Sequence, residues 1–505
     1  MTPEDSSPPA PNSASNPRED AASTDGPPPE TGAACDAGQK VYRSSVDLPV
    51  SQTEAFAYHE RAGALQRLIP PFENVRVERS DGSLRPGSRV VLKQSLFGIP
   101  LRWIAEHTRY EPPRLFADTQ KSGPFAHWLH QHHFETIGPS ESRMIDAIEY
   151  RLPGGSLGRT LGGGLVQSKL EAMFAYRHRI TRDDLALARQ HDFPASRIAI
   201  SGSSGLVGGT LTSLCSLLGH RTLSIVRDDP GNTELADDEV AAWCDDGSWG
   251  EQASKLEGVD AVVHLAGKNI ASNRWTDPVK KEIRDSRVIK TRRLCERLAR
   301  LDAPPKVLVC ASATGIYGDR GDEVLTEDSV LGDDFLAEVA QQWEAACQPA
   351  RDAGIRVVHA RFGLILWPTD GALSKSLLPA KLMGGRLGAG DQWWSWIALD
   401  DVVGAIYHAL ATDSLVGPVN FVAPQPVRNS DFAITLGRVL SRPALIPAPA
   451  FGLRLALGEM ADALLLSSTR ASSAKLQTSG YQFRFRELES ALRYMLGKNR
   501  KENAA

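Results

Sequence analysis

Apolar and polar positions alternate in short segments over residues 40–188, a pattern typical of β-strands separated by turns. One helix interrupts the strands early, and Ser51 and Glu54 form a capping box at its start. A long amphipathic helix is predicted over 165–189. The predicted strands are 41–50, 75–80, 88–94, 102–111, 115–120, 126–137 and 143–149. This stretch is therefore an α+β unit that ends in a long helix.

The pattern changes in the second part of the chain to buried strands that alternate with helices. A short apolar strand at 197–201 leads into a helix over 206–218, which ends at Gly219. A later helix begins at about residue 277. Further strands are predicted at 222–226, 261–265 and 306–310. This order predicts an α/β doubly wound Rossmann domain with a parallel sheet.

The turn between the first strand and helix of this domain carries three glycines. Gly202 allows a tight turn, Gly205 lets the backbone approach a pyrophosphate, and Gly208 lets helix and strand pack closely. The spacing departs by one residue from Gly-x-Gly-x-x-Gly, and such a turn can also be a mere connection. The strand–helix–strand context favours a dinucleotide site at the helix N-terminus. The candidate cofactor-binding residues in this part of the fold are Gly202, Ser203, Ser204, Gly205, Leu206, Val207, Gly208, Leu265, Ala266, Gly267 and Ser312.

Arg227 follows the second strand, where an acidic residue would accept hydrogen bonds from the ribose hydroxyl of NAD. A guanidinium at this position matches a 2′-phosphate, so the sequence favours NADP(H). The alternative is a solvated loop charge beside Asp228 and Asp229.

The composition limits the partners of the chain. A formal net charge of −4 over 505 residues gives no electrostatic reason to expect nucleic acid or an anionic membrane. No apolar run is long enough for a membrane span, and no signal peptide is visible. The six cysteines, which lack paired spacing, argue against a zinc site or a disulfide framework and suit a cytoplasmic protein. They are Cys35, Cys215, Cys244, Cys295, Cys310 and Cys347.

The order of strand, helix, several strands and a long final helix over 40–190 resembles the helix-grip, START-like superfamily (SRPBCC), which includes polyketide cyclases and lipid carriers. The resemblance implies a cavity for an apolar ligand between the sheet and the long helix. On the strand at 126–137, His130 and His132 share one face, while His127 and His133 share the other. Since no carboxylate or cysteine sits at helpful spacing along the chain, we expect structural histidines and no metal.

Motifs throughout residues 197–496 give a more specific resemblance. They include Gly202-x-x-Gly205-x-x-Gly208, Leu265-Ala266-Gly267, Arg274-Trp275-Thr276, Ser312-Ala313-Thr314-Gly315-Ile316-Tyr317-Gly318, Trp343-Glu344, Arg361-Phe362-Gly363 and Gly417-Pro418-Val419-Asn420-Phe421. Together they resemble an atypical branch of the extended short-chain dehydrogenases/reductases, the NAD-dependent epimerase/dehydratase-like family. The stretch after residue 446 is similar to that family's C-terminal domain of unknown function.

These patterns divide the chain into five segments. They are a disordered tail (1–39), a START-like helix-grip domain (40–190), a Rossmann NADP-binding epimerase-like domain (196–445), a small, mostly helical C-terminal domain (446–497) and a polar tail (498–505). The short connection after residue 190 predicts that the first two domains touch.

A working enzyme of this superfamily uses a Tyr-x-x-x-Lys pair, because a phenol with an ordinary pKa of about 10 is a poor base at neutral pH. The chain has Phe335 and Val339 where that pair is expected, and Ala313 replaces the usual serine. The family's usual histidine is also missing, since position 398 is alanine. The remaining candidates for a chemical role are Ser312, Thr314, Tyr317 and Glu344.

The sequence leaves three functions open. The first is an NADP(H)-dependent oxidoreductase or epimerase that acts on a small hydroxyl or carbonyl substrate. The second, favoured by the missing Tyr-x-x-x-Lys pair, is a non-catalytic NADP(H)-dependent sensor or regulatory protein, with a link to cell division among the relatives. The third is a carrier whose apolar cargo passes from the N-terminal cavity to the reductase domain. The substrate and the oligomeric state are not determined by the sequence.

Overall fold

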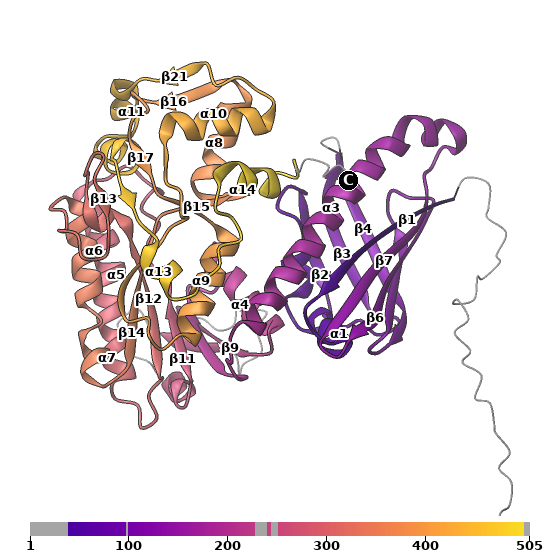
Figure 1. The fold of residues 1–505 in the computed structure, drawn as a ribbon, viewed down its shortest axis with the longest axis horizontal. Helices are drawn as coiled ribbons and strands as arrows, with labels where there is room; N and C mark the ends of the chain where they lie inside the picture. Colours follow the sequence, from indigo (N-terminus) through magenta and orange to yellow (C-terminus); the bar gives the residue numbers. More distant parts are fainter. Residues whose placement is uncertain (1–38, 97–98, 228–239, 244–250, 499–505) are drawn as a thin grey trace, which may run out of the picture.

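The computed structural model describes residues 39–96, 99–227, 240–243 and 251–498, which form an N-terminal domain and a larger C-terminal part in contact with each other (Figure 1). The two predicted tails lie almost wholly outside the described residues, as do Asp228, Asp229, Cys35 and Cys244. No helix in the described ranges is both long enough and apolar enough to cross a membrane.

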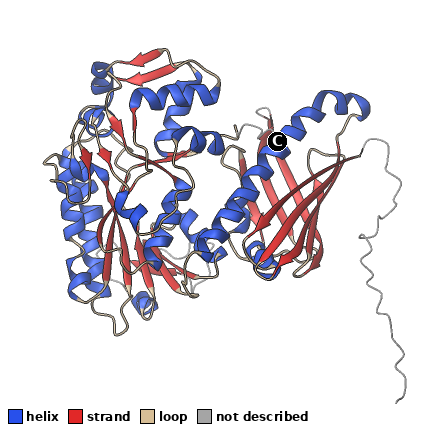
Figure 2. Cartoon of the chain, viewed as in Figure 1, coloured by secondary structure: helices blue, strands red, loops and turns tan. Residues whose placement is uncertain are grey.

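The N-terminal domain is a seven-stranded antiparallel sheet with one long helix lying across it (Figure 2). All seven predicted strands are present, in the spatial order β1-β7-β6-β5-β4-β3-β2. They are β1 (Lys40–Leu48), β2 (Val75–Ser80), β3 (Arg89–Leu96), β4 (Ile99–Glu111), β5 (Leu115–Ser122), β6 (His127–Gly138) and β7 (Glu141–Arg151). The helices are α1 (Gln52–Glu60), α2 (Ala64–Leu68) and α3 (Gly155–Arg189). This is the predicted helix-grip arrangement.

The start of α1 was predicted correctly from local sequence signals, whereas the start of α3 was not. The predicted capping box is present, since the backbone N–H of Glu54 donates to Ser51 Oγ and that of Ser51 donates to the Glu54 carboxylate. The predicted start of α3 at residue 165 is wrong, because the helix begins ten residues earlier. Glycines within 155–164 have low helix propensity and concealed this first part of the helix.

The Rossmann domain has a parallel seven-stranded sheet in the order β10-β9-β8-β11-β12-β14-β19. The order reverses between β8 and β11, so this is where a doubly wound sheet opens a crevice for a ligand. Four of these seven strands were predicted from the sequence, whereas β10, β14 and β19 were not. The strands are β8 (Arg197–Ser201), β9 (Arg221–Arg227), β10 (Val240–Trp243), β11 (Ala261–His264), β12 (Val307–Ala313), β14 (Arg356–Phe362) and β19 (Gly417–Phe421).

Helices cover both faces of this sheet, as a doubly wound fold requires. One apolar cluster joins the strands to α4 (Leu206–Leu217) and α9 (Leu399–Ala411). A second cluster on the other face contains Leu294 of α5 (Asp277–Leu298) and Trp343 of α6 (Phe335–Ala345). The remaining helices are η3 (Glu251–Leu256), η4 (Thr314–Tyr317), α7 (Gln348–Asp352), α8 (Gly371–Lys381) and α10 (Asn429–Leu440).

Short strands and helices cap the carboxyl end of the Rossmann sheet. The C-terminal segment packs there: Met460 contacts a cluster that includes Trp275 and Phe335. The short strands are β13 (Val324–Leu325), β15 (Leu364–Trp367), β16 (Gly384–Leu387), β17 (Trp393–Trp394), β18 (Trp396–Ala398), β20 (Val427–Arg428), β21 (Ile446–Ala448) and β22 (Arg470–Ala471). The C-terminal helices are α11 (Ala450–Leu457), α12 (Glu459–Ala461), η5 (Asp462–Leu466), α13 (Ala474–Thr478) and α14 (Leu488–Met495).

A buried ion network ties the two parts of the molecule together. Arg67 of α2 donates to both carboxylate oxygens of Asp184 on α3, and also to Asp400 of α9 at 2.6 Å. Arg484 donates to Asp184 at 2.8 Å from the C-terminal segment. The Arg67 and Asp184 side chains are 2% and 0% exposed, respectively. The predicted contact between the domains is therefore confirmed, and it is made by charges withdrawn from water.

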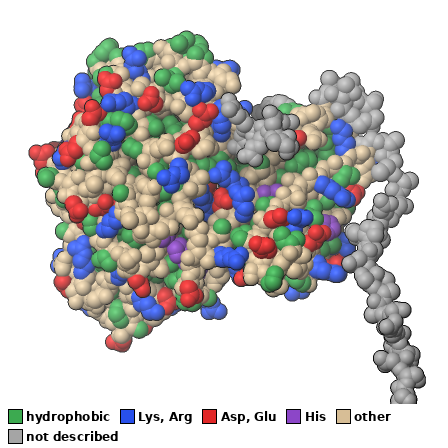
Figure 3. Space-filling model, viewed as in Figure 1, with side chains coloured by type: hydrophobic (Ala, Val, Ile, Leu, Met, Phe, Trp, Pro, Cys, Tyr) green, Lys and Arg blue, Asp and Glu red, His purple; other side chains and the backbone are tan. Residues whose placement is uncertain are grey.

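A small cavity of about 130 Å³ also lies at this junction. Its walls come from both domains, with Gln66 and Tyr176 on one side and Thr210 and Trp367 on the other. On the face seen in Figure 3, Lys and Arg side chains gather along the same junction. The interior between the sheet and α3, where the family resemblance implies a ligand cavity, is filled near α1 by Phe56, Phe116 and Phe134.

Candidate functional site

The glycine turn joins β8 to α4 at the point where the strand order reverses. Gly202 has φ of +74°, which favours glycine, and a Cβ here would lie 3.1 Å from the Leu265 carbonyl carbon and from the Ala266 nitrogen. A Cβ on Gly208 would lie 2.1 Å from the carbonyl oxygen of Gly202. Both positions thus require glycine for close packing of the turn.

The N-terminus of α4 is accessible from this turn. Gly205 is the N-cap residue and has no side chain that could occupy the first N–H groups of the helix. Ser204 and Gly205 are exposed, while Leu206 and Val207 are half-buried. The first turn of α4 can therefore offer backbone N–H groups and the positive end of the helix dipole to a phosphate.

Arg227 is the last residue of β9, where it pairs with Trp243 of β10. Its backbone thus lies at the carboxyl edge of the sheet, two strands from β11 and next to the strand that carries the glycine turn. The side chain lies outside the described part of the structure, so the role predicted for it stays a prediction.

The segment after β11 lies against the glycine turn. The N–H groups of Leu265 and Ala266 point to Ser201 Oγ, at 3.2 and 3.3 Å. Gly267 is close to the Arg287 side chain, since a Cβ at this glycine would lie 3.3 Å from the guanidinium carbon. Predicted cofactor residues from two loops are thus brought together by tertiary contacts.

Arg287 of α5 is not among the cofactor-binding residues predicted from the sequence. Its Nη1 donates to the Ile283 carbonyl at 3.2 Å, and its guanidinium lies over the Trp343 ring. No described carboxylate pairs with it, and burial lowers the pKa of Arg287 to about 10. A desolvated cation next to Gly267 is well placed to interact with an anionic ligand. The Ser286-Arg287 pair in the sequence was a signal for it, but its position beside residue 267 was not visible there.

Ser312 and Glu344, both predicted chemical candidates, are bonded directly to each other, and Arg361 binds the same carboxylate. Ser312 Oγ donates to Glu344 Oε1 at 2.7 Å. Arg361 donates to both oxygens of the same carboxylate, at 2.8 and 2.9 Å. Ser312 is 2% exposed and Arg361 is 3% exposed. Glu344 and Arg361 therefore form a bidentate ion pair at the end of β12.

Tyr317 belongs to the same buried network. Its hydroxyl donates to Asn420 Oδ1 at 2.7 Å and accepts from Arg361 Nη1 at 2.9 Å. The side chain is fully buried, and burial raises the pKa of Tyr317. The phenol is thus neutral at physiological pH and has its donor already engaged.

Thr314 differs from these three candidates because its hydroxyl makes no hydrogen bond with the described residues. It opens η4, directly beyond the carboxyl end of β12, and is 8% exposed. Ligands of open parallel sheets bind beyond this edge. Thr314 is consequently the predicted candidate with a donor still available to a ligand.

Three segments of the chain each match a known protein family or domain. Residues 198–422 match the NAD dependent epimerase/dehydratase family, residues 48–175 match the polyketide cyclase/dehydrase and lipid transport family, and residues 448–495 match a domain of unknown function. An epimerase family protein of Mycobacterium bovis is 41% identical over 298 residues, which are 59% of this chain and 96% of the relative. The chain belongs to the NAD-dependent epimerase/dehydratase family.

Two solved structures of the family extend this likeness. The nucleoside-diphosphate sugar epimerase from Corynebacterium glutamicum is 31% identical, with a TM-score of 0.73 over 92% of this chain and 91% of that chain. The human epimerase family protein SDR39U1, solved with NADPH, is 32% identical, with a TM-score of 0.54 over 59% of this chain and 99% of that chain. The first comparison therefore covers both the N-terminal domain and the epimerase-family part.

Against this epimerase-family background, the region of the absent Tyr-x-x-x-Lys pair is apolar. Phe335 packs edge-on against Trp275, with ring centroids 5.2 Å apart, and Lys280 lies over its ring. Val339 is 2% exposed. Neither position can supply a proton or hold one, so any chemistry depends on other hydroxyl groups in the site.

Proposed function

We propose that the chain is an NADP(H)-dependent oxidoreductase or epimerase that acts on a small hydroxyl or carbonyl substrate. The observation that carries this proposal is the uncapped N-terminus of α4 behind the glycine turn, at the reversal of the strand order. In support, a family member from human was solved with NADPH. The residues present fit a dinucleotide, because Gly205 leaves the first N–H groups of α4 without a side-chain cap and both Ser204 and Gly205 are exposed.

Different residues around this turn bind different parts of the dinucleotide. We assign the pyrophosphate to the first turn of α4 and the 2′-phosphate to Arg227. Arg287, which has no acidic partner among the described residues, adds positive charge beside Gly267. When bound, NADPH would supply a hydride to a carbonyl carbon.

The predicted chemical residues then fall into two groups. Thr314, with a free hydroxyl, donates a hydrogen bond to the substrate oxygen. Ser312 bonds to Glu344, and Arg361 bonds to both Glu344 and Tyr317, so these residues hold the end of β12 and with it the position of Thr314. Ser312 stays a second donor candidate, because its location at the strand end suits a substrate contact once its bond to Glu344 is broken.

The proposal is tested by following NADPH absorbance with a panel of small aldehydes, ketones and nucleoside-diphosphate sugars that carry a keto group. Oxidation of NADPH by at least one of them, with conversion of the carbonyl to the alcohol, is the expected result. A panel of nucleoside-diphosphate sugars tested for epimerisation covers the other branch of the proposal. Failure of both reactions in protein that binds NADPH would contradict an enzymatic role.

Replacing Arg227 by glutamate should weaken NADPH binding about thirtyfold, which corresponds to about 2 kcal/mol for a lost charge-assisted contact. The affinity for NADH, which lacks the 2′-phosphate, should change much less. Calorimetric titration of both nucleotides measures the two effects. An equal loss for NADPH and NADH would argue against the assignment of Arg227 to the 2′-phosphate.

Replacing Thr314 by valine keeps the side-chain shape and removes the hydroxyl. We expect kcat/KM to fall about a hundredfold, because a donor to the developing charge on the substrate oxygen is lost. The affinity for NADPH should remain unchanged. Thr314→Ser is the matched control and should retain most of the activity, whereas full activity of the valine variant would remove Thr314 from the mechanism.

A further inference from the structure

Five ionisable side chains meet on one face of the N-terminal sheet, beneath α3. In the antiparallel register Asp118 of β5 lies opposite His130 of β6, and His132 lies opposite Asp146 of β7. Directly opposite residues share a face, so both carboxylates and both imidazoles point to the same side. His178 of α3 reaches Asp146 from above, with Nε2 2.6 Å from Oδ2.

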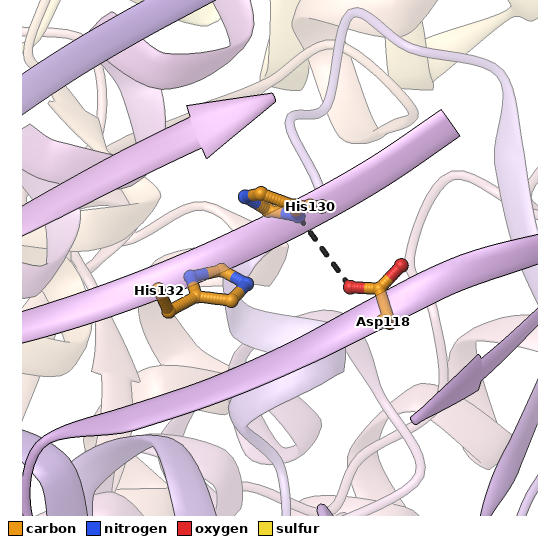
Figure 4. A group of neighbouring side chains, drawn as sticks. All are labelled: Asp118, His130 and His132. Carbon is orange, nitrogen blue, oxygen red and sulfur yellow. Dashed lines mark ion pairs between the residues drawn. The ribbon is translucent and has the colours of Figure 1, made fainter. Parts of the chain in front are cut away.

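Three of these side chains converge closely enough to share an ion. One ligand atom each from Asp118, His130 and His132 lies within 4.8 Å of the other two. Figure 4 shows the Asp118 carboxylate facing His130, and a ring nitrogen of His132 also turned toward it. The side chains of Asp118 and His132 are 15% and 13% exposed, so the site is recessed but can be reached by solvent.

Aromatic side chains pack against this polar cluster on two sides. The Phe116 ring stacks on His132, with centroids 4.1 Å apart. The rings of Trp128 and Phe174 lie against His130 on the other side. The Asp146 side chain is only 1% exposed, and a buried carboxylate needs positive charge nearby.

The positive charge in direct contact with Asp118 and Asp146 comes from histidines, while Arg177 of α3 attracts both carboxylates from a longer distance. No described Lys or Arg lies within 4.0 Å of the Asp118 or Asp146 carboxylate, and the ion-pair partners of both are imidazoles alone. His132 Nδ1 lies 2.7 Å from Asp146 Oδ1, an ion-pair contact without the geometry of a hydrogen bond. Asp146 is thus shared by three imidazoles, those of His130, His132 and His178.

We propose that Asp118, His130 and His132 bind a divalent transition-metal ion of the zinc class in the N-terminal domain. Two imidazoles and one carboxylate are a ligand set used for zinc and similar metals, and three protein ligands leave a coordination position for an exogenous oxygen. Asp146 is the outer partner, because it lies 3.1 Å from His130 Nε2 while His130 Nδ1 lies 3.5 Å from Asp118. Such a carboxylate–histidine contact orients a metal-binding ring.

The expectation of no metal rested on the absence of a carboxylate at helpful spacing along the sequence, but such spacing does not show which residues strand pairing brings together. Asp118 is 12 residues before His130 and Asp146 is 16 residues after it, yet the strand pairing places both beside the histidine. The proposal rests on this cluster alone and is independent of the function proposed for the epimerase-family part.

The test uses untagged, full-length protein that has been dialysed against a chelator and then loaded with Zn²⁺ or Co²⁺. One zinc per chain should remain after gel filtration, measured by elemental analysis. Bound Co²⁺ should give visible absorbance bands without the near-ultraviolet band of a thiolate ligand. The variants His132→Asn and Asp118→Asn should each weaken Co²⁺ binding about tenfold or more.

His133→Asn is the matched control, because His133 lies on the opposite face of β6, where its Nε2 bonds to Gln131 Oε1. This variant should bind Co²⁺ like the unaltered protein. The proposal is overturned if the unaltered protein retains no zinc and shows no cobalt bands. This result does not depend on whether any variant folds. It is also overturned if His133→Asn loses as much Co²⁺ binding as the site variants do. A thiolate band would overturn it too, because such a band would point to the buried cysteines Cys295, Cys310 and Cys347.

Discussion

Gly208→Ala is expected to lower the free energy of unfolding by about 3 kcal/mol and to weaken NADPH binding at least tenfold. The new Cβ would lie 2.1 Å from the Gly202 carbonyl oxygen and 2.9 Å from the Ser203 Cα. Both neighbours are backbone atoms, so α4 must move away from the turn. This cost exceeds the gain of about 1 kcal/mol that alanine brings to a helix. Urea denaturation and calorimetric titration with NADPH measure the two effects.

Gly164→Ala is the control for this change. Gly164 lies in α3, and a Cβ there would have no atom within 4 Å. The same chemical substitution should leave NADPH binding intact and keep or raise stability. If Gly208→Ala bound NADPH as tightly as the unaltered protein, the close approach of α4 to the glycine turn would not be what builds the site.

Arg67→Met is expected to lower the free energy of unfolding by about 3–5 kcal/mol, because it leaves Asp184 and Asp400 buried without their common partner. Methionine preserves much of the side-chain volume, so the loss reports on charge more than on packing. Arg484 remains as a partner for Asp184 and should prevent complete unfolding. Denaturant titration of the full chain measures the effect.

The contrast with a surface arginine makes this prediction specific. Arg89 pairs with Glu106 at 2.7 Å, but its side chain is 64% exposed. Arg89→Met should therefore change stability by less than about 1 kcal/mol. Similar effects of the two variants would show that the ion network at the domain junction does not hold the two parts together.

The comparison of sequence and structure shows which features are local. The capping box at Ser51 and the glycine turn at Gly202 depend on residues a few positions apart, and alternation along a strand is visible in the sequence. For this reason the seven strands of the first domain were all predicted. By contrast, the start of α3 was concealed by glycines, and β10, β14 and β19 of the second sheet were not predicted as strands.

The site was predictable only where its residues are neighbours in the chain. The sequence identified Ser312 and Glu344 as candidates but could not show that the Glu344 carboxylate accepts from both Ser312 and Arg361. Likewise, Asp118 and Asp146 come beside His130 through strand pairing over 12 and 16 residues. Contacts of this kind depend on register and on helix packing, which no local pattern specifies.

The central claim is that the turn between β8 and α4 binds NADP(H), and calorimetric titration of the purified full-length chain with NADPH and NADH tests it most directly. The account predicts saturable binding of one NADPH per chain, with clearly weaker binding of NADH. Absence of NADPH binding, or binding that Gly208→Ala leaves unchanged in folded protein, would contradict it.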